Sequence, residues 1–216
     1  KNSIFNIGSP DIDIIKKKKL PNIMNVKKRY SINFSRYGIL LWHPVTSKIF
    51  SIKKDTQKII NFLETLNKKV VIIYPNNDPG SNQIINIYQN IKNKNFKILK
   101  SLRFESFLSL LKNSEFIIGN SSSAIYEAPM FNIPSINVGD RQHKRLKLST
   151  IKNYEVEELN KTNFLKFINN FKKTRKNIFG KGNSDKKFLE ILTQKNLWEI
   201  SKQKFFSDGN RYEFYK

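Results

Sequence analysis

Histidine is the side chain whose pKa lies closest to neutral pH, and the sequence contains two. His43 follows the apolar run Gly38–Trp42 and precedes Pro44. A histidine held at the end of a buried strand can donate a hydrogen bond to a phosphate, or act as an acid or base. It can equally be a structural residue that closes the strand. His143 lies in a basic stretch that we expect to be exposed.

A cluster of serines is the second candidate. Ser121, Ser122 and Ser123 follow the apolar stretch Glu115–Ile118 and precede a predicted helix. Hydroxyl and unpaired backbone N–H groups at a helix N-terminus bind phosphate oxygens, so the cluster indicates either a diphosphate site or an ordinary serine N-cap. Glu127 lies about one helical turn further on. Its carboxylate would repel phosphate but could accept both ribose hydroxyls, as acidic residues do in dinucleotide folds, or it could simply be exposed.

Two more polar residues follow predicted strands. Arg141 comes just after the apolar segment Pro134–Val138, where a guanidinium suits phosphate, although many surface cations occur in this chain. Asn76 follows the segment Val70–Tyr74 and Pro75. Its amide could read a uracil edge or shape the local turn.

Apolar runs that alternate with helical patterns must position these residues. The predicted strands are Gly38–Trp42, Val70–Tyr74, Lys97–Leu99, Glu115–Ile118 and Pro134–Val138. The predicted helices cover Asp55–Leu66, with Asp55 as its cap, Ser81–Ile91, Phe104–Leu111 and the segment from the serine cluster through Ala128. This alternation predicts an α/β fold with a doubly wound parallel sheet. Ligands of such sheets bind at the carboxyl ends of the strands, where all the candidate residues lie.

The two ends of the sequence follow other patterns. We expect a short strand at Ile4–Ile7, then a lysine run from Lys16 to Lys19 that serves as a linker or a solvated helix face. Helices are predicted over Glu155–Phe171 and Ser184–Phe206, separated by a glycine-bearing break. The first residue is lysine, and neither an initiator methionine nor a signal-peptide core follows it, so we expect a fragment.

The composition is strongly basic, with 40 Lys and Arg against 17 Asp and Glu and a net charge of +23. Such an excess fits a nucleic-acid or acidic-membrane partner, or a surface that attracts small polyanions. The lysines are spread along the whole chain, whereas nucleic-acid-binding proteins cluster them among aromatic residues. The absence of cysteine excludes disulfides and thiolate sites and suits a reducing cytoplasm. The apolar runs are too short to span a bilayer.

Several segments together resemble one family more specifically than any single residue does. They occur in the order and spacing of the UDP-N-acetylglucosamine 2-epimerases, and their residues resemble those of the hydrolysing branch. The matching segments are Phe5–Pro10, Leu41–Thr46, Tyr74–Ser81, Ile118–Ser123 with Glu127-Ala128-Pro129, Ile136–Gln142 and Phe179–Ser184. The resemblance covers essentially the whole chain.

The resemblance implies a GT-B-like pair of facing Rossmann-like domains, of which this chain is the C-terminal half. It implies a catalytic role for His43 and UDP contacts for Asn76, Ser121, Ser122, Ser123, Glu127 and Arg141. In the family, UDP-GlcNAc loses its C2 proton and eliminates UDP, and water adds to the resulting 2-acetamidoglucal to release N-acetylmannosamine for sialic acid synthesis. No metal or cofactor, no membrane and no specific nucleic acid are implied, and the complete protein is expected to be a cytoplasmic homo-oligomer.

The resemblance also implies a domain division and two departures from the family. Residues 1–36 would end a truncated N-terminal domain, 37–183 would form the UDP-binding domain, and 184–216 would be a C-terminal helix that packs back toward the N-terminal domain. Ala124 stands where the family usually has glycine, which would crowd a close backbone approach. The family's acid and base carboxylates lie in the N-terminal domain, so this chain alone should bind UDP without turnover.

Three alternatives stay open at this point. An enzyme of the non-hydrolysing branch would form UDP-ManNAc, although the motifs His-Pro-Val-Thr and Gly-Asn-Ser-Ser-Ser argue against this branch. A related hydrolysing enzyme acts on a UDP-diacetamido sugar of legionaminic-type pathways. The UDP-binding half of the protein does not distinguish that substrate from UDP-GlcNAc. The third alternative is a non-catalytic basic module that binds RNA or a membrane surface.

Overall fold

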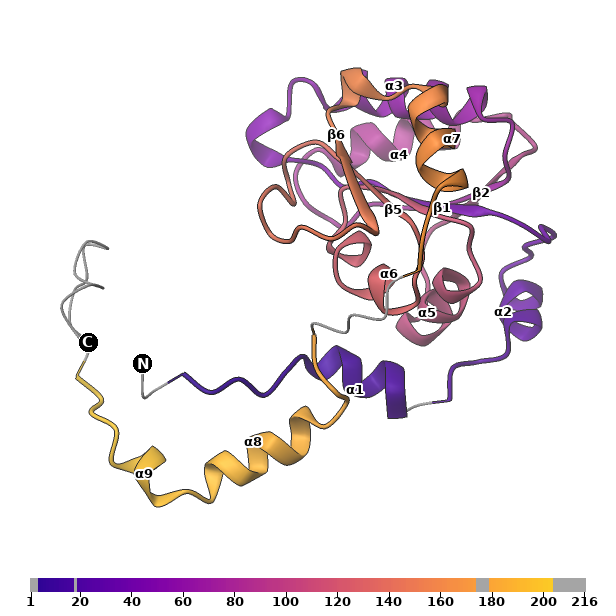
Figure 1. Ribbon diagram of the computed structural model, residues 1–216. Helices are drawn as coiled ribbons and strands as arrows, with labels where there is room; N and C mark the ends of the chain where they lie inside the picture. Colours follow the sequence, from indigo (N-terminus) through magenta and orange to yellow (C-terminus); the bar gives the residue numbers. More distant parts are fainter. Residues whose placement is uncertain (1–3, 18, 174–178, 204–216) are drawn as a thin grey trace. The chain divides into compact units, whose positions relative to one another are not determined.

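The computed structural model describes residues 4–17, 19–173 and 179–203 (Figure 1). The chain divides into two compact units, Lys19–Asn177 and a smaller one formed by Lys1–Lys18 together with Ile178–Lys216. The domain boundaries expected at residues 36 and 183 stay a prediction. Among the residues described, none of the helices is both long enough and apolar enough to cross a membrane.

The larger unit is built on a sheet of six parallel strands in the order β3-β2-β1-β4-β5-β6. The strands are β1 (Gly38–Leu41), β2 (Val70–Ile73), β3 (Phe96–Leu99), β4 (Ile117–Gly119), β5 (Ser135–Val138) and β6 (Ile151–Tyr154). The chain winds outward from β1 in one direction through β2 and β3, then returns to β4 and continues in the other direction. The predicted doubly wound sheet is therefore confirmed. Its topological switch point lies between β1 and β4, where such sheets bind their ligands.

Helices cover both faces of this sheet (Figure 1). Helices α3 (Ile52–Thr65), α4 (Ser81–Gln89) and α7 (Lys161–Asn169) lie on one face, and α5 (Phe104–Lys112) and α6 (Glu127–Met130) lie on the other. Helix α2 (Ile23–Arg29) packs against α5. The main core lies under α3, α4 and α7, where Phe164 packs edge-to-face on Phe62 and Phe116 with ring centroids 5.8 and 5.0 Å apart.

The smaller unit joins segments that are far apart in the sequence. Helix α1 (Pro10–Lys17) packs against α8 (Ser184–Leu192), which is followed by the single turn α9 (Lys195–Trp198). Asp13 of α1 caps α8: its carboxylate accepts the Ser184 hydroxyl at 2.7 Å and the backbone N–H groups of Ser184 and Asp185, both at 3.2 Å. The cap satisfies two of the donors that a helix leaves unpaired at its N-terminus, so α1 fixes where α8 begins.

Two predictions about the elements were wrong, and one strand was not predicted. Helix α3 begins at Ile52 with Ser51 as N-cap, and Asp55 lies in its first turn, where its carboxylate accepts the Ser51 hydroxyl at 2.6 Å. Ile4–Ile7 does not form a strand. The sequence reading also missed β6, because Lys152 and Asn153 are exposed and an edge strand carries no apolar run; it forms because it pairs with β5.

The long C-terminal helices are shorter than predicted. Glu155–Phe171 divides into a 3-10 turn, η3 (Val156–Glu158), and α7, because a capping box between Glu155 and Glu158 closes the turn and Asn160 starts the helix. Ser184–Phe206 divides into α8 and α9, and its last three residues lie outside the described part of the chain.

Gly119 allows β1 and β4 to approach each other at the switch point. It pairs with Leu41, has φ +135°, and a Cβ atom placed on it would lie 2.0 Å from the Leu41 carbonyl oxygen. Any side chain would therefore have to push β1 away from β4. A glycine at this position is therefore a requirement of the sheet itself.

We expect Gly119→Ala to destabilise the fold by roughly 3 kcal/mol or more, because backbone strain and a clash with main-chain atoms add together. Gly139→Ala is the matched control, since Gly139 also has positive φ (+73°) but nothing lies within 4 Å of its Cβ position. The control should lose only about 1–2 kcal/mol. Urea unfolding measures both variants, and equal losses would contradict the close approach at Gly119.

Candidate functional site

The sequence-predicted site residues lie after four neighbouring strands, at one edge of the sheet. His43 follows β1, Asn76 follows β2, the serine cluster follows β4 and Arg141 follows β5. Because all four strands are parallel, their carboxyl ends meet at the same edge. The sequence could predict this gathering from the strand order of a doubly wound sheet, but not the contacts within it.

Asn120 connects the two strands at the switch point. Its side chain is fully buried, its Oδ1 accepts the backbone N–H of His43 at 2.8 Å, and its Nδ2 donates to the His43 carbonyl at 2.8 Å. Its own N–H donates to the Leu41 carbonyl at 3.2 Å. Both backbone groups of His43 are therefore held by one side chain, beyond the point where the strand pairing ends.

The loop after β5 is anchored on the same residue. The backbone carbonyl of Asn120 accepts hydrogen bonds from Arg141 Nη1 at 3.1 Å and from Gln142 Nε2 at 3.0 Å. Gln142 is buried, with 3% of its surface exposed, and the Gln142 Oε1 atom has no partner among the described residues. Asp140 pairs with Lys48 at 2.7 Å on the outer side of the loop. Arg141 is thus held beside His43 with guanidinium donors to spare.

The His43 ring is fixed by the loop after β2. The backbone N–H of Asn76 donates to His43 Nδ1 at 3.1 Å, which assigns the proton of the neutral ring to Nε2. Burial lowers the pKa of His43 to about 4, the Arg141 charge adds to this effect, and the Asp78 charge and the hydrogen bond from Asn76 oppose it. At neutral pH the ring is therefore an uncharged Nε2–H donor. Its Nδ1 lone pair is occupied, which argues against a base acting through that atom.

Asn76 has the second of the two roles that the sequence left open, because its side chain shapes the local turn, and a contact with UDP stays a prediction. The side-chain amide donates to the Asp78 carboxylate, and the Ser81 hydroxyl at the start of α4 donates to the Asn76 carbonyl. The side chain therefore stabilises the turn, and the backbone N–H orients His43.

The serine cluster forms a 3-10 turn, η2 (Ser122–Ala124), and the predicted continuous helix through Ala128 was wrong. The turn ends at Ala124, with Ile125 as its C-cap, and a separate turn, α6, begins at Glu127. The Ser121 hydroxyl accepts the N–H of Ser123 at 3.3 Å and so acts as the cap, and Ser121 is buried. Ser122 and Ser123 are the partly exposed serines of the cluster.

Glu127 and Ala124 complete this segment. Glu127 is partly exposed and is the first residue of α6, which contacts the turn η2 that carries the serines. Ala124 is 1% exposed, which means that the protein itself encloses its methyl group. The alanine therefore adds no side chain to the exposed surface of the site.

Hydrogen bonds join four of the residues to one another: His43, Asn76, Asn120 and Arg141. Ser122, Ser123 and Glu127 lie on the turns η2 and α6, which follow β4 in the chain. The sequence reading assigned no role to Asn120 or Gln142. A buried asparagine directly after a strand that ends in glycine is the signal that could have pointed to Asn120, because a buried amide must find partners.

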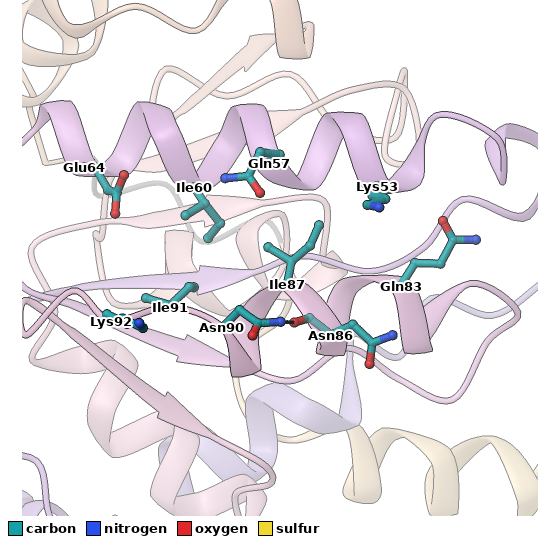
Figure 2. Close-up of a pocket in the computed structure, with 10 residues that line it drawn as sticks. All are labelled: Lys53, Gln57, Ile60, Glu64, Gln83, Asn86, Ile87, Asn90, Ile91 and Lys92. Atoms are coloured by element: carbon teal, nitrogen blue, oxygen red, sulfur yellow. Dashed lines mark hydrogen bonds between the residues drawn. The ribbon is translucent and has the colours of Figure 1, made fainter.

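A groove of about 630 Å³ between α3 and α4 lies apart from these residues. Figure 2 shows aliphatic side chains from both helices between the exposed amides of Gln57, Gln83, Asn86 and Asn90. No residue of the predicted site lines it. Size alone is a weak guide to function, and the charged residues among those that line this groove are Lys53, Glu64 and Lys92.

We expect His43 to titrate with a pKa near 4, measured by NMR on imidazole-labelled protein, with a His43→Gln variant to assign the resonance. Because the folded pKa lies below the unfolded value of about 6.5, protonation favours the unfolded chain. This contribution to stability should be lost as the pH falls from about 6.5 toward 4, and His43→Gln should remove that dependence. A midpoint near 6.5 in the folded protein would contradict the buried, Arg141-flanked ring.

The chain is similar in sequence to curated 2-epimerases. The chain is 34% identical over 211 residues to a UDP-N-acetylglucosamine 2-epimerase of Neisseria meningitidis serogroup B, covering 96% of this chain and 56% of that protein. It is 30% identical over 193 residues to the hydrolysing UDP-N,N'-diacetylbacillosamine 2-epimerase of Legionella pneumophila, covering 88% of this chain and 51% of that protein. The chain thus spans about half the length of these curated relatives.

Solved structures show the same fold. The UDP-GlcNAc 2-epimerase of Methanocaldococcus jannaschii, solved in complex with UDP-GlcNAc and UDP, matches with a TM-score of 0.68 at 23% identity, over 89% of this chain and 55% of that one. The family described as UDP-N-acetylglucosamine 2-epimerase matches residues 1–193. With this match over most of its length, and with its Rossmann-like sheet, the chain belongs to the UDP-N-acetylglucosamine 2-epimerase family.

Proposed function

We propose that this chain supplies the UDP-binding half of a hydrolysing UDP-N-acetylglucosamine 2-epimerase. The observation that carries the proposal is the hydrogen-bonded edge at the switch point, where a neutral His43 donor lies beside Arg141. This arrangement suits a ligand that carries phosphate charge, and the family relationship supplies the nucleotide sugar.

Each residue has a role in this proposal. Arg141 and the hydroxyls of Ser122 and Ser123 contact the diphosphate, because these side chains are partly exposed and carry hydrogen-bond donors. Glu127 accepts the ribose hydroxyls. The overall charge of +23 attracts the anionic ligand toward the protein.

His43 acts on the leaving group. When the C1–O bond of the sugar breaks, its electron pair leaves with the diphosphate, and negative charge grows on the departing oxygen. A neutral Nε2–H donor stabilises this charge, and the adjacent Arg141 guanidinium adds to the effect. The group needs no change of protonation state, which fits a ring whose pKa is about 4.

The rest of the reaction follows the hydrolysing route. A base removes the C2 proton as UDP leaves, a C1–C2 double bond forms, and water then adds OH to C1 and H to C2 on the opposite face. The product is N-acetylmannosamine. The carboxylates at this edge have other partners or roles, since Asp78 accepts from the Asn76 amide, Asp140 pairs with Lys48 and Glu127 is assigned to the ribose. We therefore assign that step to the part of the relatives that this chain does not match.

A second substrate is favoured by two relatives. Besides the Legionella enzyme, a GDP/UDP-N,N'-diacetylbacillosamine 2-epimerase (hydrolyzing) of Campylobacter jejuni is 34% identical over 161 residues. A UDP-diacetamido sugar would present the same uridine and diphosphate to this chain. The two substrates therefore differ only in the sugar, away from the residues discussed.

UDP binding tests the proposal directly. Ser122→Ala and Glu127→Gln should each weaken binding by about 1–3 kcal/mol in calorimetric titrations, because each removes a hydrogen bond to the ligand. Ser35→Ala and Glu64→Gln are matched controls at exposed positions outside the site. Unchanged affinity in both site variants would remove the assigned contacts.

The same titrations, repeated over a salt series with an oligonucleotide and ADP, separate the basic-module alternative. Binding through charge alone collapses steeply with salt and has no nucleobase preference. A shaped site should retain its preference for UDP, and equal, salt-sensitive binding of all three ligands would favour the alternative.

Turnover by the isolated chain is the next prediction. We expect the 216-residue polypeptide to bind UDP-GlcNAc but to release neither UDP nor N-acetylmannosamine, because the C2 base is supplied elsewhere. Coupled UDP release and mass spectrometry of the sugar measure this. Release of N-acetylmannosamine by the chain alone would show that it contains the missing base.

A further inference from the structure

We infer that Asn120 is a positioning residue of this site: its buried amide fixes the His43 peptide and thereby aims the imidazole at the ligand. The inference rests on the proposed function, because the value of an aimed Nε2–H depends on a phosphate being there. The contacts themselves are independent of that function.

The amide makes a two-point contact with one residue. Oδ1 accepts from the His43 N–H and Nδ2 donates to the His43 carbonyl, both at 2.8 Å. Two bonds on either side of the same Cα define the orientation of that residue, and with it the direction in which its side chain leaves the backbone. Asparagine carries its donor and its acceptor on two separate atoms, whereas aspartate lacks the donor and serine, with both functions on one oxygen, cannot reach both groups.

The contact takes the place of strand pairing. The ladder between β1 and β4 ends at Leu41 and Gly119, so the backbone groups of His43 lie beyond it. Unpaired buried backbone groups are costly, and Asn120 satisfies them while leaving the chain free to turn toward Pro44. The loop after β2 then fixes the ring itself through the N–H of Asn76.

The same residue places the neighbouring charge. Because the Asn120 carbonyl accepts from Arg141 and Gln142, displacement of Asn120 would move the guanidinium as well as the imidazole. The charged groups that act on His43 are Arg141 and Asp78, one on each side of the switch point. Asn120 therefore couples the His43 imidazole to the Arg141 guanidinium, the two groups assigned to the phosphates.

The test compares Asn120→Ser with Asn137→Ser. Asn137 lies on β5, is 1% exposed and bonds to Gly139 and Asn153, so it is a buried asparagine without a bond to His43. Three quantities are measured in each variant: melting temperature, UDP affinity, and the imidazole ¹⁵N resonances and titration of His43. His143 in the same spectra reports on changes that are not specific to the site.

Both variants should melt at lower temperature, but only Asn120→Ser should weaken UDP binding, by about tenfold for a loss near 1.4 kcal/mol. Only Asn120→Ser should also shift the His43 resonances and raise its titration midpoint above 4. A lower melting temperature with unchanged His43 resonances and unchanged UDP affinity would reduce Asn120 to a structural residue and overturn the inference.

Hydrogen exchange in the unmodified chain provides a measurement that needs no variant. The His43 amide should exchange slowly, although it lies past the end of β1, because it donates to a buried oxygen. Exchange as fast as that of exposed Thr46 and Ser47 would overturn the inference. If the unmodified chain fails to bind UDP, the proposed function fails, while hydrogen exchange and the His43 resonances still decide the role of Asn120.

Discussion

The hydrogen bonds between the Asn120 amide and the His43 peptide hold together the place where the sheet changes direction. At that place β1 and β4 are neighbours, but the connections that follow them diverge, so the backbone beyond the ladder loses its partners. Gly119 lets the strands approach closely, and Asn120 then closes the gap. The orientation of His43, the position of Arg141 and the path of the loop after β5 all depend on this contact.

The electrostatics of the edge follow from that geometry. A buried imidazole beside a guanidinium stays neutral, and a neutral ring whose Nδ1 is occupied can only donate through Nε2. The protein thus presents a neutral donor and a fixed charge next to each other at this edge. Preorganised donors of this kind stabilise developing negative charge without reorganisation during the reaction. The basic surface of the chain acts over a longer range and only on the approach of anions.

The chain matches about half the length of its curated relatives. In the proposed function, the residues that converge at the switch point are donors for a diphosphate. The smaller unit, in which α1 caps α8 through Asp13, ties the first and last described segments to each other.

The sequence by itself determined the parallel sheet, five of its strands and the edge at which the site lies. Continuous apolar runs such as Val70–Ile73 can be buried only in a sheet covered on both faces, and strand order then follows from short right-handed connections. Tertiary structure alone decided β6, whose polar residues become a strand because β5 offers a free edge. It also decided the roles of Asn120 and the Asn76 backbone, because a hydrogen bond between residues 77 positions apart depends on how two strands are brought together, which no local pattern records.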